Sequence, residues 1–191
     1  MNGKKIINNN PGAAALDNQG NLTIGGNGTI ANASSTLNSY ALMNTLGTLV
    51  IENGTFGSAV NGGNALYSLY GTVTINGGTF SCVNRANDPN VYPYLIKAEG
   101  GEVTINNATI DSDANGMFSA DWGAVINVNN GSYALRDGGN NHYLVYCVSG
   151  STVNLNGGSY SFAGSSVNNT PIYKNGSTVT ISDNCETSWN K

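Results

Sequence analysis

Charged residues are scarce in this chain of 191 residues: only 9% are Asp, Glu, Lys or Arg, and the formal net charge is −4. An average soluble domain has about 25% charged residues. The seven basic residues are scattered along the chain and form no basic patch of the kind that binds a phosphate backbone. The sequence therefore predicts no nucleic-acid partner.

Long apolar segments and cysteines are also few. No apolar run reaches the ~20 residues of a membrane-spanning helix, and the N-terminal residues contain no apolar region of the signal-peptide kind. The three cysteines, Cys82, Cys147 and Cys185, are odd in number and lack C-x-x-C spacing. This pattern argues against a disulfide framework or a zinc site. We expect no membrane span, and we expect the cysteines to be small buried side chains.

The sequence lacks a sustained helical period as well. Its 26 glycines and many asparagines disfavour helices. A disordered chain would have few β-branched residues, whereas Val, Ile and Thr recur here at fixed spacing. These features predict an all-β fold.

What the chain has instead is a repeat, which is clearest in residues 71–80, GTVTINGGTF. Aligned on Ile75, the repeat has a period of about 26 residues, and the copies carry apolar residues at up to three constant offsets, as expected of β-strands. The reference positions are Ile24, Ile51, Ile75, Ile105, Val128, Leu155 and Ile181; two residues earlier stand Leu22, Leu49, Val73, Val103, Ile126, Val153 and Val179; five residues later stand Phe56, Phe80, Ile110, Tyr133 and Tyr160, with Ile30 one residue late. A further apolar cluster in each copy, such as 40–42, 65–67 or 143–145, predicts a third strand.

One such unit cannot bury its own apolar face, but stacked units bury a continuous column. We therefore predict a single-domain parallel β-helix of about seven coils with three short strands each, stacked at ~4.8 Å. Residues 1–19 would form an N-terminal coil, 20–182 the regular coils and 183–191 the C-terminal end. Asn76, Asn106, Asn129 and Asn156 each follow a reference position, so we expect their amides to form a ladder at one bend.

The GTVTINGGTF repeat with its asparagine ladder resembles the right-handed parallel β-helix proteins of the pectate-lyase-like solenoid superfamily. The resemblance covers about residues 20–182. It implies a right-handed helix, and it implies a function among those of the superfamily: polysaccharide lyases and hydrolases, bacterial surface adhesins, and phage tailspikes, fibres and head appendages.

Four of the seven aspartates stand in loops that leave one corner of three consecutive coils. These loops hold both arginines and the only histidine, and planar guanidiniums, carboxylates and tyrosines suit contacts with sugars or proteins. The alternative is a set of solvated loops whose charges pair with each other. The candidate ligand-binding residues are Arg85, Asp88, Tyr92, Tyr94, Asp111, Asp113, Arg136, Asp137, His142 and Tyr143.

We assign no catalytic residue, no metal site and no cofactor from the sequence. The acidic residues that a polysaccharide lyase needs on its strands are almost absent, since Glu102 is the only acidic residue at the outward positions around Val73 and its equivalents. A calcium-loop pattern, D-x-D-x-N-G, begins at Asp111, but Trp122 stands where the loop needs its bidentate Glu.

The sequence thus favours a non-enzymatic structural or attachment protein. Our first hypothesis is a homotrimeric subunit of a phage virion appendage, such as a head fibre, decoration protein or tail fibre, with the phage assignment taken from the resemblance. The alternatives are a bacterial cell-surface adhesin or glycan-binding protein, with a possible glycan ligand, and a polysaccharide-acting enzyme.

Overall fold

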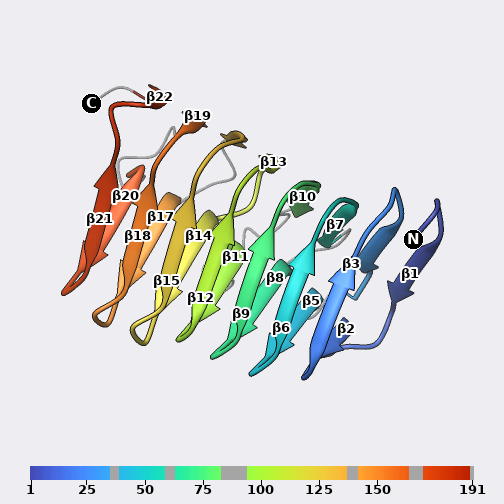
Figure 1. Ribbon diagram of the computed structural model, residues 1–191. Helices are drawn as coiled ribbons and strands as arrows, with labels where there is room; N and C mark the ends of the chain where they lie inside the picture. Colours follow the sequence, from blue (N-terminus) through green and yellow to red (C-terminus); the bar gives the residue numbers. More distant parts are fainter. Residues whose placement is uncertain (35–38, 59–62, 83–93, 137–141, 164–169, 190–191) are drawn as a thin grey trace.

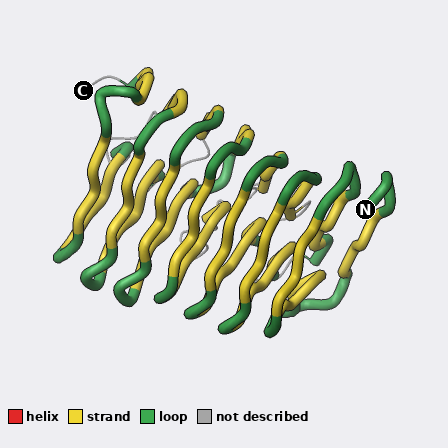
Figure 2. The backbone as a smooth tube through the Cα atoms, in the orientation of Figure 1, coloured by secondary structure: helices red, strands yellow, loops and turns green. Residues whose placement is uncertain are grey.

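The computed structural model describes residues 1–34, 39–58, 63–82, 94–136, 142–163 and 170–189, and every regular element in these residues is a β-strand. The strands wind into a parallel β-solenoid whose coils stack from the N-terminal to the C-terminal end (Figure 1). Figure 2 shows the same backbone as strands joined by short bends, without a helix. The described residues therefore contain no helix long and apolar enough to cross a membrane.

Three parallel sheets form the sides of the solenoid, and each coil contributes one strand to each sheet. Sheet A contains β1 (Lys5–Asn8), β4 (Thr29–Asn32), β7 (Thr55–Ser58), β10 (Thr79–Cys82), β13 (Thr109–Ser112), β16 (Ser132–Leu135), β19 (Gly158–Phe162) and β22 (Cys185–Ser188). Sheet B contains β2 (Ala14–Asn18), β5 (Tyr40–Thr45), β8 (Asn64–Leu69), β11 (Tyr94–Glu99), β14 (Gly116–Asp121), β17 (Tyr143–Val148) and β20 (Ile172–Asn175). Sheet C contains β3 (Asn21–Ile24), β6 (Thr48–Ile51), β9 (Thr72–Ile75), β12 (Glu102–Ile105), β15 (Val125–Val128), β18 (Thr152–Leu155) and β21 (Thr178–Ile181).

The all-β parallel solenoid with coils of about 26 residues and three strands is confirmed. The solenoid makes about six turns rather than the seven coils predicted. The difference arises because the seven reference positions are stacked strands of sheet C, and seven stacked strands are separated by six turns.

The core is the column of apolar residues that the repeat predicted. Ile75 pairs in register with Ile51 on one side and Ile105 on the other, and the same register continues through sheet C from Ile24 to Ile181. In sheet A the large residues five positions later also pair from coil to coil, and the rings of Phe56 and Phe80 stack with centroids 5.0 Å apart. Constant offsets in the sequence therefore correspond to columns of contacts in space, which are buried along the solenoid but not at its C-terminal end, where Ile181 is 42% exposed. Two of the three cysteines, Cys82 and Cys147, are buried as predicted, and Cys185 is half-buried.

The predicted amide ladder at the bend after sheet C is also present. Each asparagine side chain donates a hydrogen bond from Nδ2 to Oδ1 of the equivalent residue in the preceding coil: Asn106 to Asn76 at 2.8 Å, Asn129 to Asn106 at 2.9 Å and Asn156 to Asn129 at 3.0 Å. Asn76 in turn donates to both carboxylate oxygens of Glu52 at 3.1 Å. All bonds of the ladder therefore point the same way and end on a carboxylate, which only accepts.

Replacing an asparagine inside this ladder should destabilise the solenoid. Asn106→Ala removes one donated and one accepted hydrogen bond, each worth about 0.5–1.5 kcal/mol. We therefore expect the free energy of unfolding, measured in urea by circular dichroism, to fall by about 1–3 kcal/mol. Asn107→Ala, at the next exposed position, is the matched control and should stay within about 0.5 kcal/mol. Equal losses in both variants would show that the ladder does not stabilise the fold.

Candidate functional site

Tyrosines gather on the outer side of sheet B. Of the ten tyrosines in the chain, two lie in the core and six lie on strands of this sheet, where they contact one another or a charged side chain. We call the surface that they form the tyrosine face, and its members are Tyr40, Tyr67, Tyr94, Tyr143, Tyr146 and Tyr173. No other surface of the described residues concentrates one aromatic side chain in this way.

The C-terminal half of the tyrosine face encloses a groove of about 440 Å³, a volume within the range of ~300–1,000 Å³ that is usual for small-ligand sites. Its tyrosines contact each other in a chain, with ring centroids 5.0–5.6 Å apart. We call it the Ser119 groove, and its lining residues are Tyr94, Lys97, Ser119, Asp121, Tyr143, Tyr146 and Tyr173. It therefore offers ring faces, hydroxyls, one amine and one carboxylate to a ligand.

A glycine lets one of these rings lie across the neighbouring strand. Gly116 pairs in register with Tyr94 on one side and Tyr143 on the other. A Cβ atom at Gly116 would lie 2.1 Å from Cδ1 of Tyr94, so the Tyr94 ring occupies the space that a side chain would fill. This position brings Tyr94 within 5.6 Å of Tyr146, which lies two coils further along the solenoid.

In the N-terminal half of the tyrosine face, the side chains of Lys97 and Glu99 form an ion pair. The Lys97 amine lies 2.6 Å from Oε1 of Glu99 and 5.2 Å from the centroid of the Tyr67 ring. The Tyr67 hydroxyl donates to Oε2 of Glu99 at 2.6 Å, and the ring of Tyr67 stacks on that of Tyr40 at 5.0 Å. The charge of Lys97 is therefore held toward Glu99 and Tyr67.

The phenol groups of Tyr67 and Tyr146 hold their protons strongly. Burial, the hydrogen bond to Glu99 and the charge of Glu99 raise the pKa of Tyr67 well above its ordinary value. Burial raises the pKa of Tyr146, and Tyr173, Asp121 and Tyr143 add to this effect. These hydroxyls consequently stay neutral at physiological pH and can both donate and accept hydrogen bonds.

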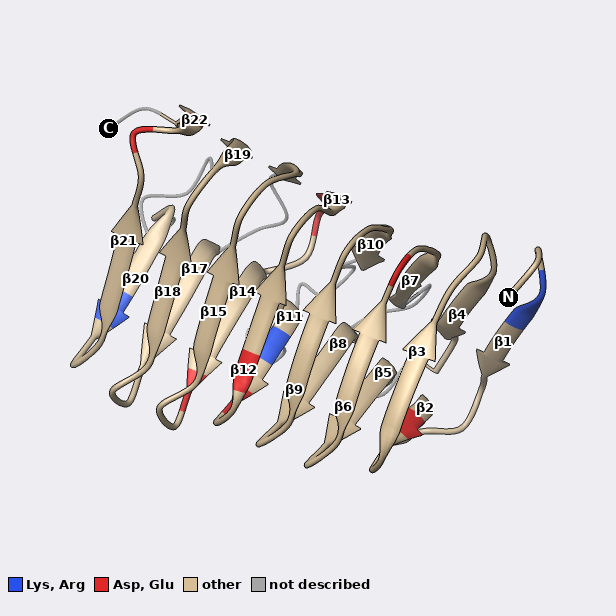
Figure 3. Ribbon diagram, in the orientation of Figure 1, with Lys and Arg blue, Asp and Glu red and all other residues tan. Residues whose placement is uncertain are grey.

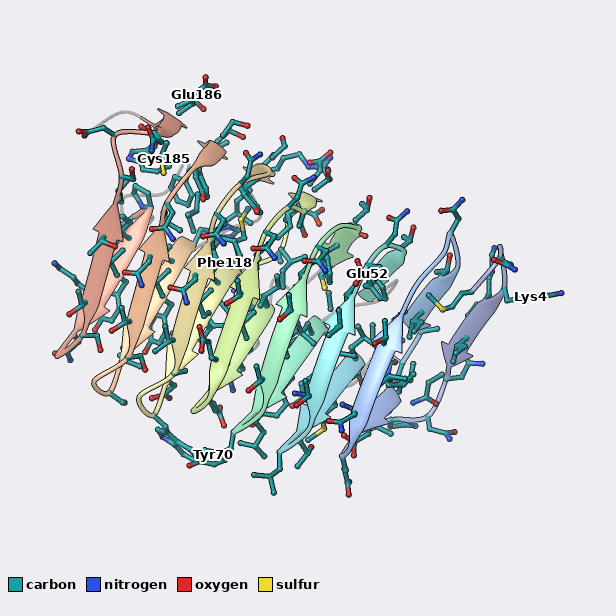
Figure 4. All side chains as sticks on the ribbon, in the orientation of Figure 1. Lys4, Glu52, Tyr70, Phe118, Cys185 and Glu186 are labelled. Atoms are coloured by element: carbon teal, nitrogen blue, oxygen red, sulfur yellow. The ribbon has the colours of Figure 1, made fainter. Side chains whose placement is uncertain are left out.

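A second aromatic surface lies at the bend between sheets B and C. Leu46, Tyr70 and Trp122 are 74%, 51% and 56% exposed, and the rings of Tyr70 and Trp122 are 6.2 Å apart. All three have positive φ angles of 54–59°, which is unusual for bulky side chains. Figure 4 shows Tyr70 at this outer edge, while Phe118 points into the solenoid. We call this surface the corner ridge.

No protein-family model matches the chain, and neither a curated protein nor a solved structure matches it. The site is therefore interpreted from its own residues.

The structure separates the loop residues that the sequence grouped as one site. Arg85, Asp88, Tyr92 and Asp137 lie outside the described residues. Tyr94 and Tyr143 belong instead to the tyrosine face, at equivalent positions of β11 and β17, and both line the Ser119 groove. The structure thus brings these two together with Tyr146 and Tyr173, which the sequence analysis did not select.

The charged candidates lie on the side of sheet A. Asp111 is on β13, and its Oδ1 lies 3.0 Å from Nε of Arg136, which follows β16. Both side chains are more than 60% exposed, so the pair is solvated and contributes little stability. This contact agrees with the alternative of loop charges that pair with each other.

The other two candidates do not line the Ser119 groove. His142 is fully buried just before β17, and Asp113 is half-buried between β13 and β14. The calcium-loop pattern beginning at Asp111 forms the end of β13, a bend and the start of β14. Within the described residues no cluster of three His, Cys, Asp or Glu side chains could hold a metal ion.

Proposed function

We propose that this protein is a non-enzymatic attachment protein that binds a glycan through its tyrosine face. The observation that carries the proposal is the Ser119 groove, in which four tyrosines surround a polar floor. Tyrosine presents an apolar ring face with a polar tip, so it can pack on the C–H face of a sugar while its hydroxyl bonds to sugar hydroxyls. The sparse charge of the solenoid suits a ligand that is recognised by stacking and hydroxyl contacts (Figure 3).

The resemblance to parallel β-helix proteins suggests two kinds of assembly in which the protein would bind a glycan. In a phage virion appendage the chain would be one subunit of a homotrimer, and on a bacterial cell surface it would be part of an adhesin. Both settings need a rigid scaffold that holds a binding surface. The outer side of sheet C, whose strands carry Glu102 as their only charged residue, suits packing against sister subunits in the first setting.

Binding to arrayed bacterial polysaccharides, followed by calorimetry with soluble hexasaccharides, tests the proposal. We expect the wild-type protein to bind at least one glycan and Tyr146→Ala to weaken that binding by at least about tenfold, because truncated interface tyrosines commonly cost this much. Tyr70→Ala on the corner ridge is the matched control and should leave binding within about twofold.

Three results would contradict the proposal. Absence of binding to every arrayed glycan, or undiminished binding by Tyr146→Ala, would remove the tyrosine face as a glycan site. Release of new reducing ends from a bound hexasaccharide would show that the protein is an enzyme. Glu99 and Asp121, which are in-register neighbours on β11 and β14, would then be the carboxylates to replace.

A further inference from the structure

The bend between sheets B and C has a left-handed backbone in six consecutive coils. The residue that follows each strand of sheet B from β5 to β20 has a φ of 54–65°. These residues are Leu46, Tyr70, Gly100, Trp122, Ser149 and Gly176. Glycine adopts this conformation without steric cost, whereas a residue with a side chain loses stability in it. Because two of the six positions hold glycine, the bend itself does not require the bulky side chains of the corner ridge.

Burial does not offset the cost of these side chains. Leu46, Tyr70 and Trp122 are all more than half exposed. The Tyr70 ring lies over Gly100, since a Cβ atom there would be 2.3 Å from Cδ1 of Tyr70. This position brings the ring within 6.2 Å of the Trp122 ring, two coils further along the solenoid. Strained residues cluster at functional sites, and exposed apolar patches mark interaction surfaces, so a binding partner explains the corner ridge better than the fold does.

Acidic residues stand beside the aromatic part of the ridge, at the bends next to β12 and β15 (Figure 3). Asp121 directly precedes Trp122. Glu99 and Glu102 enclose the two glycines of the bend one coil earlier, and the amine of Lys97 lies 2.6 Å from Oε1 of Glu99. Glu102 and Asp121, in contrast, form no ion pair within the residues that the structure describes. These two carboxylates next to the exposed rings are therefore available to a cation of a partner.

Neighbouring donors hold both carboxylates in place. Oδ1 of Asp121 accepts a hydrogen bond from the backbone N–H of Trp122 at 2.8 Å. Oε1 of Glu102 accepts one from Nδ2 of Asn127 at 2.9 Å. Glu102 also lies in register with Val125, three residues after Trp122. An ionised carboxylate has two oxygens and accepts several hydrogen bonds, so each of the two can still bind a donor from outside.

We infer that the corner ridge is the docking surface for a basic protein segment, whose arginine side chains stack on the exposed rings and pair with the carboxylates of Glu102 and Asp121. A guanidinium group is planar, stacks on aromatic faces and donates two parallel hydrogen bonds to a carboxylate, so it matches both features of the ridge. Anionic partners are disfavoured by the same carboxylates. The inference does not rest on glycan binding, although Asp121 also lines the Ser119 groove.

Binding of a fluorescein-labelled nonaarginine peptide, followed by fluorescence anisotropy at low ionic strength, tests this surface. Trp122→Gly removes the ring and relieves the left-handed backbone, so we expect peptide binding to weaken at least about tenfold while the melting temperature does not fall. Ser149→Gly is the matched control, because it relieves the same bend one coil further on, where φ is 56°, without removing a ring. It should bind the peptide within about twofold of the wild type.

Two charge variants separate the ridge from the overall negative charge of the chain. Glu102→Gln and Glu52→Gln each remove one exposed carboxylate, but Glu52 lies at the other end of sheet C, where it accepts from Asn76. We expect Glu102→Gln to weaken peptide binding about threefold or more and Glu52→Gln to leave it within about 1.5-fold. Nonalysine, which has the same charge without planar groups, should bind the wild-type protein more weakly than nonaarginine.

Several results would overturn the inference. Equal binding by Trp122→Gly and the wild type, or equal losses in Glu102→Gln and Glu52→Gln, would show that overall charge alone holds the peptide. A clear decrease in the melting temperature of Trp122→Gly would show that the ring serves the fold. Binding to phosphatidylcholine vesicles, or a monomer–dimer equilibrium, that is lost in Trp122→Gly would make the ridge a membrane contact or a contact between two copies instead.

Discussion

Ile75→Asp is expected to lower the melting temperature by at least about 15 °C, measured by circular dichroism in the β-strand region. Ile75 is fully buried in the middle of the sheet C column, between Ile51 and Ile105. Removing its side chain costs about 2–5 kcal/mol in packing, and burying a carboxyl group adds several kcal/mol more. The sum approaches the ~5–15 kcal/mol that stabilises a typical domain.

The residue before it provides a matched control. Thr74 lies on the same strand but points outward, with uncharged Val50 and Thr104 as its neighbours in register. Thr74→Asp should change the melting temperature by no more than about 2 °C. Similar effects of the two substitutions would contradict the inward and outward alternation on which the fold rests.

The Ile75→Asp variant should also depend on pH in a defined direction. Burial disfavours the charged form and therefore raises the carboxyl pKa in the folded state above its value in the unfolded chain. The folded state then binds more protons than the unfolded state, so stability decreases as the pH rises through this range. The variant should recover part of its melting temperature when the pH is lowered from about 7 to about 4.

Gly101→Ala is expected to lower the melting temperature by about 10 °C. Gly101 has a φ of +69°, and a Cβ atom there would lie 2.2 Å from the carbonyl oxygen of Gly71 in the preceding coil. That oxygen accepts a hydrogen bond from the backbone N–H of Glu102 at 3.0 Å. An added methyl group would force the two coils apart and break this bond, at a total cost of about 3–5 kcal/mol.

Gly123→Ala separates the steric effect from the backbone effect. Gly123 has nearly the same φ, +74°, but no atom lies within 4 Å of the position of its Cβ. An alanine at position 123 loses only the about 1–2 kcal/mol that a residue with a side chain pays for a left-handed backbone conformation. This loss corresponds to a decrease of about 2–6 °C in the melting temperature. If both variants melted at the same temperature, close contact between coils would not explain the glycine at position 101.

The fold could be predicted closely because two spacings in the repeat specify it. The offset between Val73 and Ile75 gives the strand period, and the distance from Ile75 to Ile105 gives the coil length. The strand period follows from backbone geometry, and the coil length is the spacing of the repeat, so both are visible without any tertiary contact. The amide ladder through Asn76 and Asn106 was predictable for the same reason.

The tyrosine face was less visible in the sequence. Tyr67 and Tyr143 each adjoin two apolar residues, and a tyrosine fits a buried or an exposed position equally well. The signal that does distinguish the outer column is Lys97, which occupies the same repeat position as Tyr67, Ser119 and Tyr146. The ring position of Tyr94 was not predictable, because it depends on the space over Gly116 in the next coil.

The directions of the bonds in this fold also determine how it responds to force. Hydrogen bonds between coils run along the solenoid axis, each coil is held mainly by its two neighbours, and the N-terminus and C-terminus lie at opposite ends (Figure 1). Tension between the two ends would stretch these hydrogen bonds along their length. The bonds between one pair of coils would break before those of the next pair, so the coils would separate one at a time. A pull on a ligand at the tyrosine face, directed along the strands, would instead load the ladders on both sides of β14 in shear, and many bonds would resist together.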